Sequence, residues 1–394
     1  MPHDQPNRDP SATTEATGSA TSRPSSEQLS AGGGRRVPGV PDLPLPVASP
    51  RRLRWFTLVS LAVAAVVVLL VAGFNAVVDP YGTIGTSIFP TVTWTDRALK
   101  VDLLGRLTTP PGIVVLGSSR AMKVEPAYIA EKTGARGGFN AAVSNGRPID
   151  AWAFVNLIHE RWPDHTPSYL WLLDVEAFRP WPPDPGLVGT PELVAYLPER
   201  MREALHLTDL KLLASWETTS MSLRSIRKAL RDRGPETSTQ KADFAADGFR
   251  IRNYQDDRLA AGRPLAAGLR YTKRQATKTY SDDYKALDPI ARRYFTRTVA
   301  LINRLGATPV IVISPQHPDV TAAVARLGWA ARRREVLRFL AAQRRRHRLI
   351  VLDYTAIDRF HGSPNDFYDG YHMTVPNTRR LVDAVLRAHP DALR

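Results

Sequence analysis

The longest uncharged apolar stretch of the chain runs from Trp55 to Val78. As a helix rising about 1.5 Å per residue, it is long enough to cross a hydrocarbon core of about 30 Å. A helix of this length inside a soluble protein ordinarily keeps a polar face. A secretory signal peptide has a shorter apolar stretch and does not follow about fifty residues of polar chain. The pattern therefore predicts one transmembrane helix over residues 55–78.

The flanks of this stretch predict its orientation. Arg51, Arg52 and Arg54 precede it and Asp79 follows it. Because basic residues are retained on the cytoplasmic side, we expect a cytoplasmic N-terminus and an extracytoplasmic domain, anchored in the cell membrane by a single pass. Residues 1–50 are rich in Pro, Ser, Thr, Gly and Ala without a hydrophobic period. Such a segment buries too little apolar surface to fold, so it is predicted to be a disordered cytoplasmic tail.

Beyond the span, short apolar runs alternate with stretches of helical spacing. Five runs have the composition of buried strands: 112–117, 137–143, 168–175, 308–314 and 348–355. Amphipathic stretches lie between and after them, at 148–161, 290–306 and 377–388. This alternation predicts an α/β domain over residues 80–394, a three-layer sandwich around a mainly parallel five-stranded sheet. A polar, charged insertion with only weak helical stretches interrupts it at about 178–287.

The charge and composition of the chain limit the kinds of molecule that it is expected to bind. The net charge is +15, which suits anionic partners such as phospholipid headgroups or acidic glycans. No nucleic-acid-binding motif is present, and the outward topology disfavours a nucleic-acid partner. The basic stretch 331–348 has a solvated helix face as its default interpretation and contact with anionic lipid or an acidic polymer as its alternative. Without cysteine, the chain can form neither disulfides nor thiolate metal sites.

The first candidate for chemistry is the serine pair Ser118–Ser119, which follows the first predicted strand directly. The carboxyl ends of parallel strands are where α/β sheets bind ligands. A serine at a strand-to-helix turn exposes its hydroxyl, and its backbone N–H can help to bind an oxyanion. The alternative is an ordinary helix N-cap.

The second candidate lies near the C-terminus, in the sequence YDGYHMT. Asp369 and His372 are spaced i, i+3, so the carboxylate can orient the imidazole for service as a general base. A zinc site would need a further His or carboxylate, and no HxxxH or HxH spacing occurs. We therefore expect neither a metal nor another cofactor.

Together, "LGSSR", "FNAAVSNGRP" and "YDGYHMT" resemble, in order and spacing, the sequence blocks of the SGNH (GDSL-like) hydrolase superfamily. "DPYG" after the span and "LLDVEAF" in the third strand also look like membrane-anchored SGNH-like proteins of the bacterial envelope. Relatives in that group act on acyl esters of polysaccharides or teichoic acids. The resemblance covers residues 80–394 without the insertion and implies an SGNH, flavodoxin-like fold.

Carried over residue by residue, the resemblance implies that Ser119 is the nucleophile, His372 the general base and Asp369 its orienting carboxylate. Ser118 stands where the family usually has aspartate, and it becomes the alternative nucleophile if the turn is shifted by one residue.

The family's oxyanion hole implies backbone N–H groups from Ser119 and from Asn145 or Gly146. The third block normally adds an asparagine, but this chain has Asp174 and Glu176 there, so Asn140 or Asn145 would have to substitute. A carboxylate facing an oxyanion repels it, and losing one oxyanion donor costs about 10²–10³ in rate.

Arg120 and Asp174 are candidate substrate-binding residues, with Arg120 directed either to an anionic substrate or to Glu125 or Asp174. The resemblance implies a membrane-anchored serine acyl-esterase or O-acyltransferase that acts on envelope glycans through an acyl-enzyme. Transfer to a sugar would require a multi-pass membrane partner to deliver the acyl group. The alternative is a catalytically inactive SGNH-like protein that binds glycan or serves as a scaffold for an envelope polymer assembly.

Overall fold

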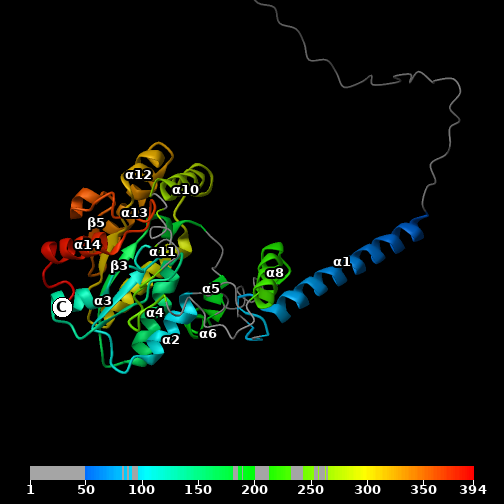
Figure 1. Cartoon of the computed structure of the whole chain (residues 1–394), viewed down its shortest axis with the longest axis horizontal. Coiled ribbons are helices and arrows are strands. Elements are labelled where there is room, and N and C mark those ends of the chain that lie inside the picture. The colour runs from blue at the N-terminus through cyan, green and yellow to red at the C-terminus, as the bar shows by residue number, and fades with distance from the viewer. Residues whose placement is uncertain are drawn as a thin grey trace, which may run out of the picture. The chain divides into compact units, whose positions relative to one another are not determined.

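The computed structural model describes residues 49–81, 84–86, 88–90, 96–180, 185–188, 190–199, 213–231, 243–252, 256, 262 and 265–394. Its first element is the helix α1 (Pro50–Val78), which is long and apolar enough to cross a membrane (Figure 1). The predicted helix at 55–78 is thus observed, with an additional N-terminal turn that includes the three arginines. Residues 1–48 of the predicted disordered tail lie outside the described residues.

The remainder is built around a five-stranded parallel sheet, as the sequence predicts. The strands are β1 (Ile113–Gly117), β2 (Gly138–Asn140), β3 (Ser168–Leu173), β4 (Val310–Ile313) and β5 (Ile350–Asp353), in the order β2-β1-β3-β4-β5. The chain leaves β1 on one side towards β2 and returns on the other side as β3. This reversal opens a crevice at the carboxyl ends of β1 and β3.

Helices cover both faces of this sheet (Figure 1). The described helices around it are α2 (Asp96–Arg106), α3 (Pro126–Thr133), α4 (Pro148–Arg161), α11 (Pro289–Arg304), α12 (Pro318–Val324), α13 (Trp329–Arg344) and α14 (Val375–Ala388). Helices α3 and α14 lie together, where Tyr128 donates to Asp383 at 2.8 Å. Helices α4 and α11 pack through Trp152 and Tyr294.

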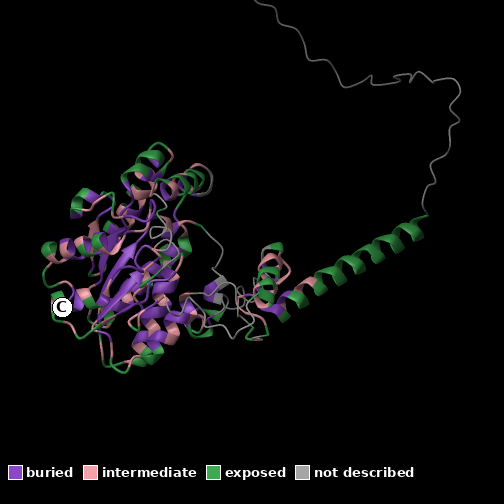
Figure 2. Cartoon of the chain, in the orientation of Figure 1, coloured by how far each residue is buried: buried purple, intermediate pink, exposed green. Residues whose placement is uncertain are grey.

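The strands read as continuous apolar runs because both of their faces are covered. β1 and β4 are almost wholly buried, as the purple strands of Figure 2 show. Trp171 of β3 packs on Phe295 of α11, with ring centroids 5.1 Å apart. This core fixes the strand ends from which the polar loops emerge.

Where the sequence predicted only weak helical stretches, the described part of the insertion contains two long helices, α8 (Trp216–Arg231) and α10 (Leu265–Lys278). Beside them are the shorter α5 (Pro185–Val188), α6 (Pro191–Val194) and a π-turn, η2 (Thr279–Asp283). Helix α10 packs beside α12 and meets the C-terminal loop, where Thr272 Oγ1 accepts from Gly370 N–H at 3.2 Å. The insertion therefore supports the loop that carries Asp369 and His372.

Candidate active site

Ser119 owes its position to the glycine at the end of β1. Gly117 has φ +146°, and a Cβ there would lie 2.6 Å from Leu172 O and 2.9 Å from Ala121 Cβ. Only glycine fits this close approach to the neighbouring parallel strand β3. The chain then turns sharply, with Ala121 N–H donating to Ser118 O at 2.9 Å. The turn holds Ser119 at the carboxyl edge of the sheet.

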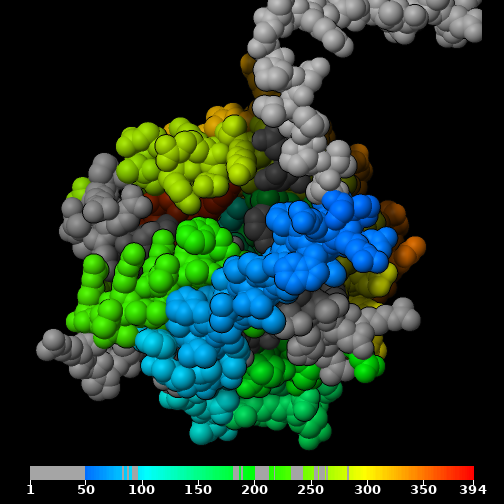
Figure 3. All heavy atoms as spheres, turned by 90° about the vertical axis from the view of Figure 1, so that its right-hand side faces the viewer, coloured from blue at the N-terminus to red at the C-terminus, as the bar shows by residue number. Residues whose placement is uncertain are grey.

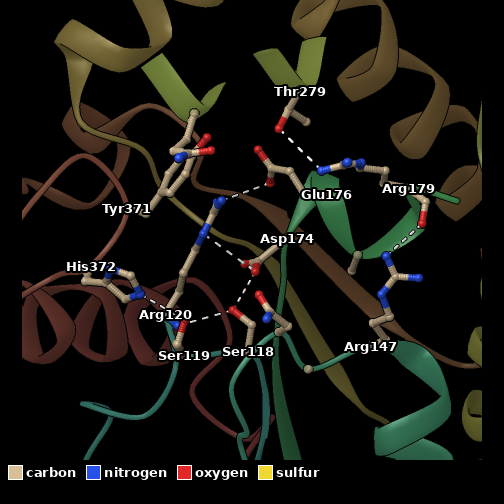
Figure 4. Close-up of a pocket in the computed structure, with 14 residues that line it drawn as sticks. Ser118, Ser119, Arg120, Arg147, Asp174, Glu176, Arg179, Thr279, Tyr371 and His372 are labelled. Carbon is tan, nitrogen blue, oxygen red and sulfur yellow. Dashed lines mark hydrogen bonds and ion pairs between the residues drawn. The ribbon is translucent and has the colours of Figure 1, made fainter. Parts of the chain in front are cut away.

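The structure brings Ser119, His372 and Asp369 together in one hydrogen-bonded chain. Ser119 Oγ lies 2.8 Å from His372 Nε2 (Figure 4). His372 Nδ1 lies 2.9 Å from Asp369 Oδ2 and 3.1 Å from Oδ1. With Asp369 ionised, Nδ1 carries the proton and Nε2 is left as an acceptor for the serine hydroxyl. This is the arrangement of a nucleophile, its base and the group that orients the base.

Local backbone contacts keep the Asp369 carboxylate charged. Burial raises the pKa of this carboxyl, but His372 and the N–H groups of Tyr371 and His372, at 2.7 and 2.9 Å, outweigh burial and leave its pKa below the usual range. The loop itself is closed by Tyr368 N–H donating to His372 O at 2.8 Å. Asp369 therefore provides a fixed negative charge next to His372 Nδ1.

His317, at the end of β4, does not join this chain. Its ring Nδ1 accepts from the backbone N–H of Asp319 at 3.1 Å, and its own backbone N–H donates to Gly370 O at 3.0 Å. It caps α12 and braces the 369–372 loop instead of lining the crevice.

Ser118, the alternative nucleophile, points elsewhere. Its buried hydroxyl donates to Asp174 Oδ2, and its oxygen accepts from Arg120 N–H at 3.2 Å. The shifted turn is thus wrong: Ser118 is part of a polar network at the end of β3.

Arg120 and Asp174 line the crevice, as expected of candidate substrate contacts, but they pair with each other. Arg120 Nε lies 3.6 Å from Asp174 Oδ2, and Nη2 lies 3.0 Å from Glu176 Oε2 (Figure 4). The guanidinium stacks 3.9 Å from the centre of the Tyr371 ring. Burial opposes its charge, yet the two carboxylates raise its pKa above the usual value. Glu125, the other partner considered for Arg120, pairs with Arg379.

Glu176 is held from its other side as well. Its Oε1 accepts from Tyr280 at 2.6 Å and from Gln316 Nε2 at 3.2 Å. The two carboxylates that replace the expected asparagine are therefore tied to a cation and to neutral donors. This arrangement reduces the repulsion that they would exert on an oxyanion beside Ser119.

Two of the oxyanion candidates are already engaged. Asn140 is fully buried, and its amide donates to Ala121 O at 2.9 Å and Val124 O at 2.8 Å; it does not line the crevice. Gly146 lines the crevice, but its N–H donates to Val143 O at 3.0 Å. Both assignments are corrected because these groups already donate within the fold, the Asn140 amide to the segment after β1 and the Gly146 N–H to the turn after β2.

Asn145 and the Ser119 N–H remain as candidate oxyanion donors. Asn145 lines the crevice with left-handed backbone, φ +51°, a conformation that asparagine tolerates better than most residues. Within the described part of the chain, neither its side chain nor the Ser119 N–H donates to another residue. Both can therefore face an incoming carbonyl oxygen.

The crevice is a cavity of about 260 Å³ (Figure 4). Beyond the residues above, its lining includes Arg147, Ala177, Arg179, Gln275 and Thr279. Arg147 Nη2 donates to Arg179 O at 2.8 Å, and Arg179 Nη1 to Thr279 Oγ1 at 3.4 Å. The two arginines follow predicted strand ends, so topology could have identified them. Gln275 and Thr279 come from the insertion, whose sequence gives no such signal.

Among the described residues, no group of three or more His, Asp or Glu side chains is placed to hold a metal ion. Compared with protein-family models, the chain matches none. Its sequence also matches no curated protein. The geometry of the Ser119–His372–Asp369 chain is thus the main guide to function.

Proposed function

We propose that this protein is a membrane-anchored, SGNH-like serine acyl-esterase or O-acyltransferase that acts on acyl esters of cell-envelope glycans. The observation that carries the proposal is the continuous hydrogen-bonded chain from Ser119 Oγ through His372 to Asp369, at 2.8 and 2.9 Å. A serine beside an imidazole that a buried carboxylate orients is equipped for covalent acyl transfer.

In the proposed reaction, Ser119 Oγ attacks the acyl carbonyl while His372 Nε2 accepts the hydroxyl proton. The Ser119 N–H and the Asn145 side chain donate to the developing oxyanion. Collapse of this intermediate breaks the ester bond, and His372 returns the proton to the departing alcohol. Water or a sugar hydroxyl, deprotonated by His372, then attacks the Ser119 ester. The acyl group leaves as a free acid or as a new sugar ester, and His372 returns the proton to Ser119 Oγ.

The proposed location follows from α1. Arg51, Arg52 and Arg54 precede the apolar stretch, and the preference of basic residues for the cytoplasmic side supports a cytoplasmic N-terminus and an extracytoplasmic α/β domain. The proposed partners are a polysaccharide or teichoic-acid-like polymer, the membrane lipid and, for transfer, a multi-pass membrane protein that supplies the acyl group. Arg147 and Arg179 at the crevice suit an anionic polymer.

The proposal is tested with the full chain in detergent. Hydrolysis of p-nitrophenyl acetate and covalent labelling by a fluorophosphonate are compared between wild type, Ser119→Ala and Ser118→Ala. Ser119→Ala should lose labelling and at least about 10³ of kcat/KM, because no nucleophile remains. Ser118→Ala should still be labelled, since the nucleophile and its base are intact.

A catalytically inactive glycan-binding role is the second candidate, favoured by Asp174 standing in place of the third-block asparagine. If wild type and Ser119→Ala are labelled and hydrolyse equally slowly, the enzymatic proposal is refuted and the binding role takes its place.

A further inference from the structure

Helix α8 has its polarity reversed relative to an ordinary surface helix. Its buried positions are the small polar residues Thr218, Ser222 and Ser225. Trp216, Leu223 and Leu230 are exposed at 79%, 40% and 75%. Residues seven apart lie on nearly the same side of a helix, so these three form one apolar stripe. Exposing such a stripe to water is energetically unfavourable, so another apolar surface is expected to cover it.

The polar side of α8 is fastened to the end of α1. Asn75 is fully buried, and its amide donates to Leu213 O at 2.6 Å and to Thr219 Oγ1 at 3.0 Å. Ser222 Oγ donates to Asn75 Oδ1 at 2.7 Å. The spheres of α8 and the C-terminal end of α1 lie side by side in Figure 3. These bonds occupy every polar atom of the amide in a place where water is excluded.

The length of α1 sets the level of this junction. About twenty apolar residues, Trp55–Phe74, precede Asn75 and span about 30 Å as a helix, the thickness of a hydrocarbon core. Just beyond it, Asp79 Oδ2 accepts from the N–H groups of Ile84, Gly85 and Thr86 at 2.7–3.3 Å. The chain thus changes from apolar to polar within one turn of Asn75, and α8 is attached at that boundary.

The charges of α8 suit an anionic lipid surface. Arg224, Arg227 and Arg231 are exposed beside the apolar stripe. An amphipathic helix with Trp and Leu on one side and arginines at its margins binds in the headgroup region, and each cation near an anionic leaflet adds to the attraction.

We propose that α8 lies in the headgroup region of the leaflet where α1 ends, with its Trp216–Leu223–Leu230 stripe towards the acyl chains and its arginines among anionic headgroups. It is a second membrane contact beside the transmembrane helix. The proposal rests on α1 crossing the membrane and is independent of any catalytic activity.

The absence of cysteine allows a direct test. Single variants Leu223→Cys, Leu230→Cys and, as a control at an exposed position at the start of α11, Ile290→Cys are labelled with an environment-sensitive fluorophore. Each full-length protein is reconstituted in vesicles of phosphatidylcholine with phosphatidylglycerol. Probes at 223 and 230 should be blue-shifted, quenched by nitroxide-bearing lipids and protected from aqueous iodide, whereas the probe at 290 should show the opposite behaviour.

The arginines are tested in the same vesicles. Replacing phosphatidylglycerol with phosphatidylcholine, or combining Leu230→Cys with Arg224→Glu and Arg227→Glu, should reduce nitroxide quenching at 230. If probes at 223 and 230 are as open to iodide as the probe at 290, the proposal is overturned. Because the vesicles contain lipid but no other protein, that result would mean that lipid does not cover the stripe and would favour a protein partner in its place.

Discussion

Replacing Arg120 with methionine measures how much its buried ion pairs in the crevice contribute to the free energy of unfolding. The change removes the guanidinium that lies 3.6 Å from Asp174 and 3.0 Å from Glu176, with all three side chains largely buried. At an effective dielectric constant of about 20, each contact corresponds to about 5 kcal/mol of gross attraction. Desolvation offsets much of this, so the net loss expected from breaking a buried pair is about 3–5 kcal/mol.

Thermal unfolding of the full chain in detergent, followed by near-ultraviolet circular dichroism, measures this loss. At about 2 °C per kcal/mol for a domain of this size, Tm should fall by about 6–10 °C. The matched control is Arg106→Met, which breaks an exposed pair with Asp102 and should shift Tm by about 1 °C or less.

The origin of the effect is tested by removing the charges left behind. Adding Asp174→Asn and Glu176→Gln to Arg120→Met leaves neutral groups of the same shape, so most of the lost Tm should return. The reasoning is refuted if Arg120→Met unfolds at the wild-type temperature, or if the triple variant is less stable than the single one.

Three further outcomes follow from the site. Asp369→Asn should lower kcat by about 10³–10⁴ with little change in KM, because the imidazole loses its orienting anion; equal kinetics in an ester assay would contradict this. Because the pKa of Asp369 is lower in the folded state, its charge stabilises the protein above about pH 4 and this contribution disappears as the pH falls further. The Tm difference between wild type and Asp369→Asn should therefore shrink below about pH 4, and a constant difference would argue against it. Gly146→Ala places a Cβ 2.1 Å from Gly117 O and should cost about 1–3 kcal/mol in thermal unfolding, whereas Gly105→Ala, with open space around it, should not destabilise.

The sheet could be predicted because its strands are buried on both faces. Such strands have to be apolar throughout, so "GIVVLG" and "TPVIVIS" stand out from the surrounding sequence. The end of β2 could not be placed, because apolar residues continue to the end of the predicted run 137–143, whereas the strand ends at Asn140, whose amide bonds to Ala121 and Val124 exist only in the folded protein.

Part of the candidate site could likewise be predicted from the sequence, and part could not. Ser119, Asp369 and His372 follow strand ends or share one loop, so short patterns identify them. The partner of Arg120 was open, since a substrate, Glu125 and Asp174 were equal alternatives at the level of sequence. Only the parallel pairing of β1 with β3, which sets Gly117 beside Leu172, brings Arg120 and Asp174 close enough to show that they pair.

The contribution of the insertion was beyond the sequence. Thr272 and Gly268 of α10 contact the loop of Asp369, but nothing in their sequence marks them as neighbours of a residue about a hundred positions away. The orientation of helix α8 could not be predicted either, because its apolar positions face outward and its small polar positions face inward, the reverse of the usual pattern.

The separation of Ser119 from His372 along the chain, 253 residues, has a consequence for biosynthesis. The proposed nucleophile is synthesised early, whereas the proposed base and its carboxylate follow only after β5. A chain interrupted before residue 369 holds a serine without a base and has no means of activating it. In the proposed mechanism, reactivity therefore requires residues 369–372 to be synthesised and brought to Ser119, so copies that lack them stay chemically silent.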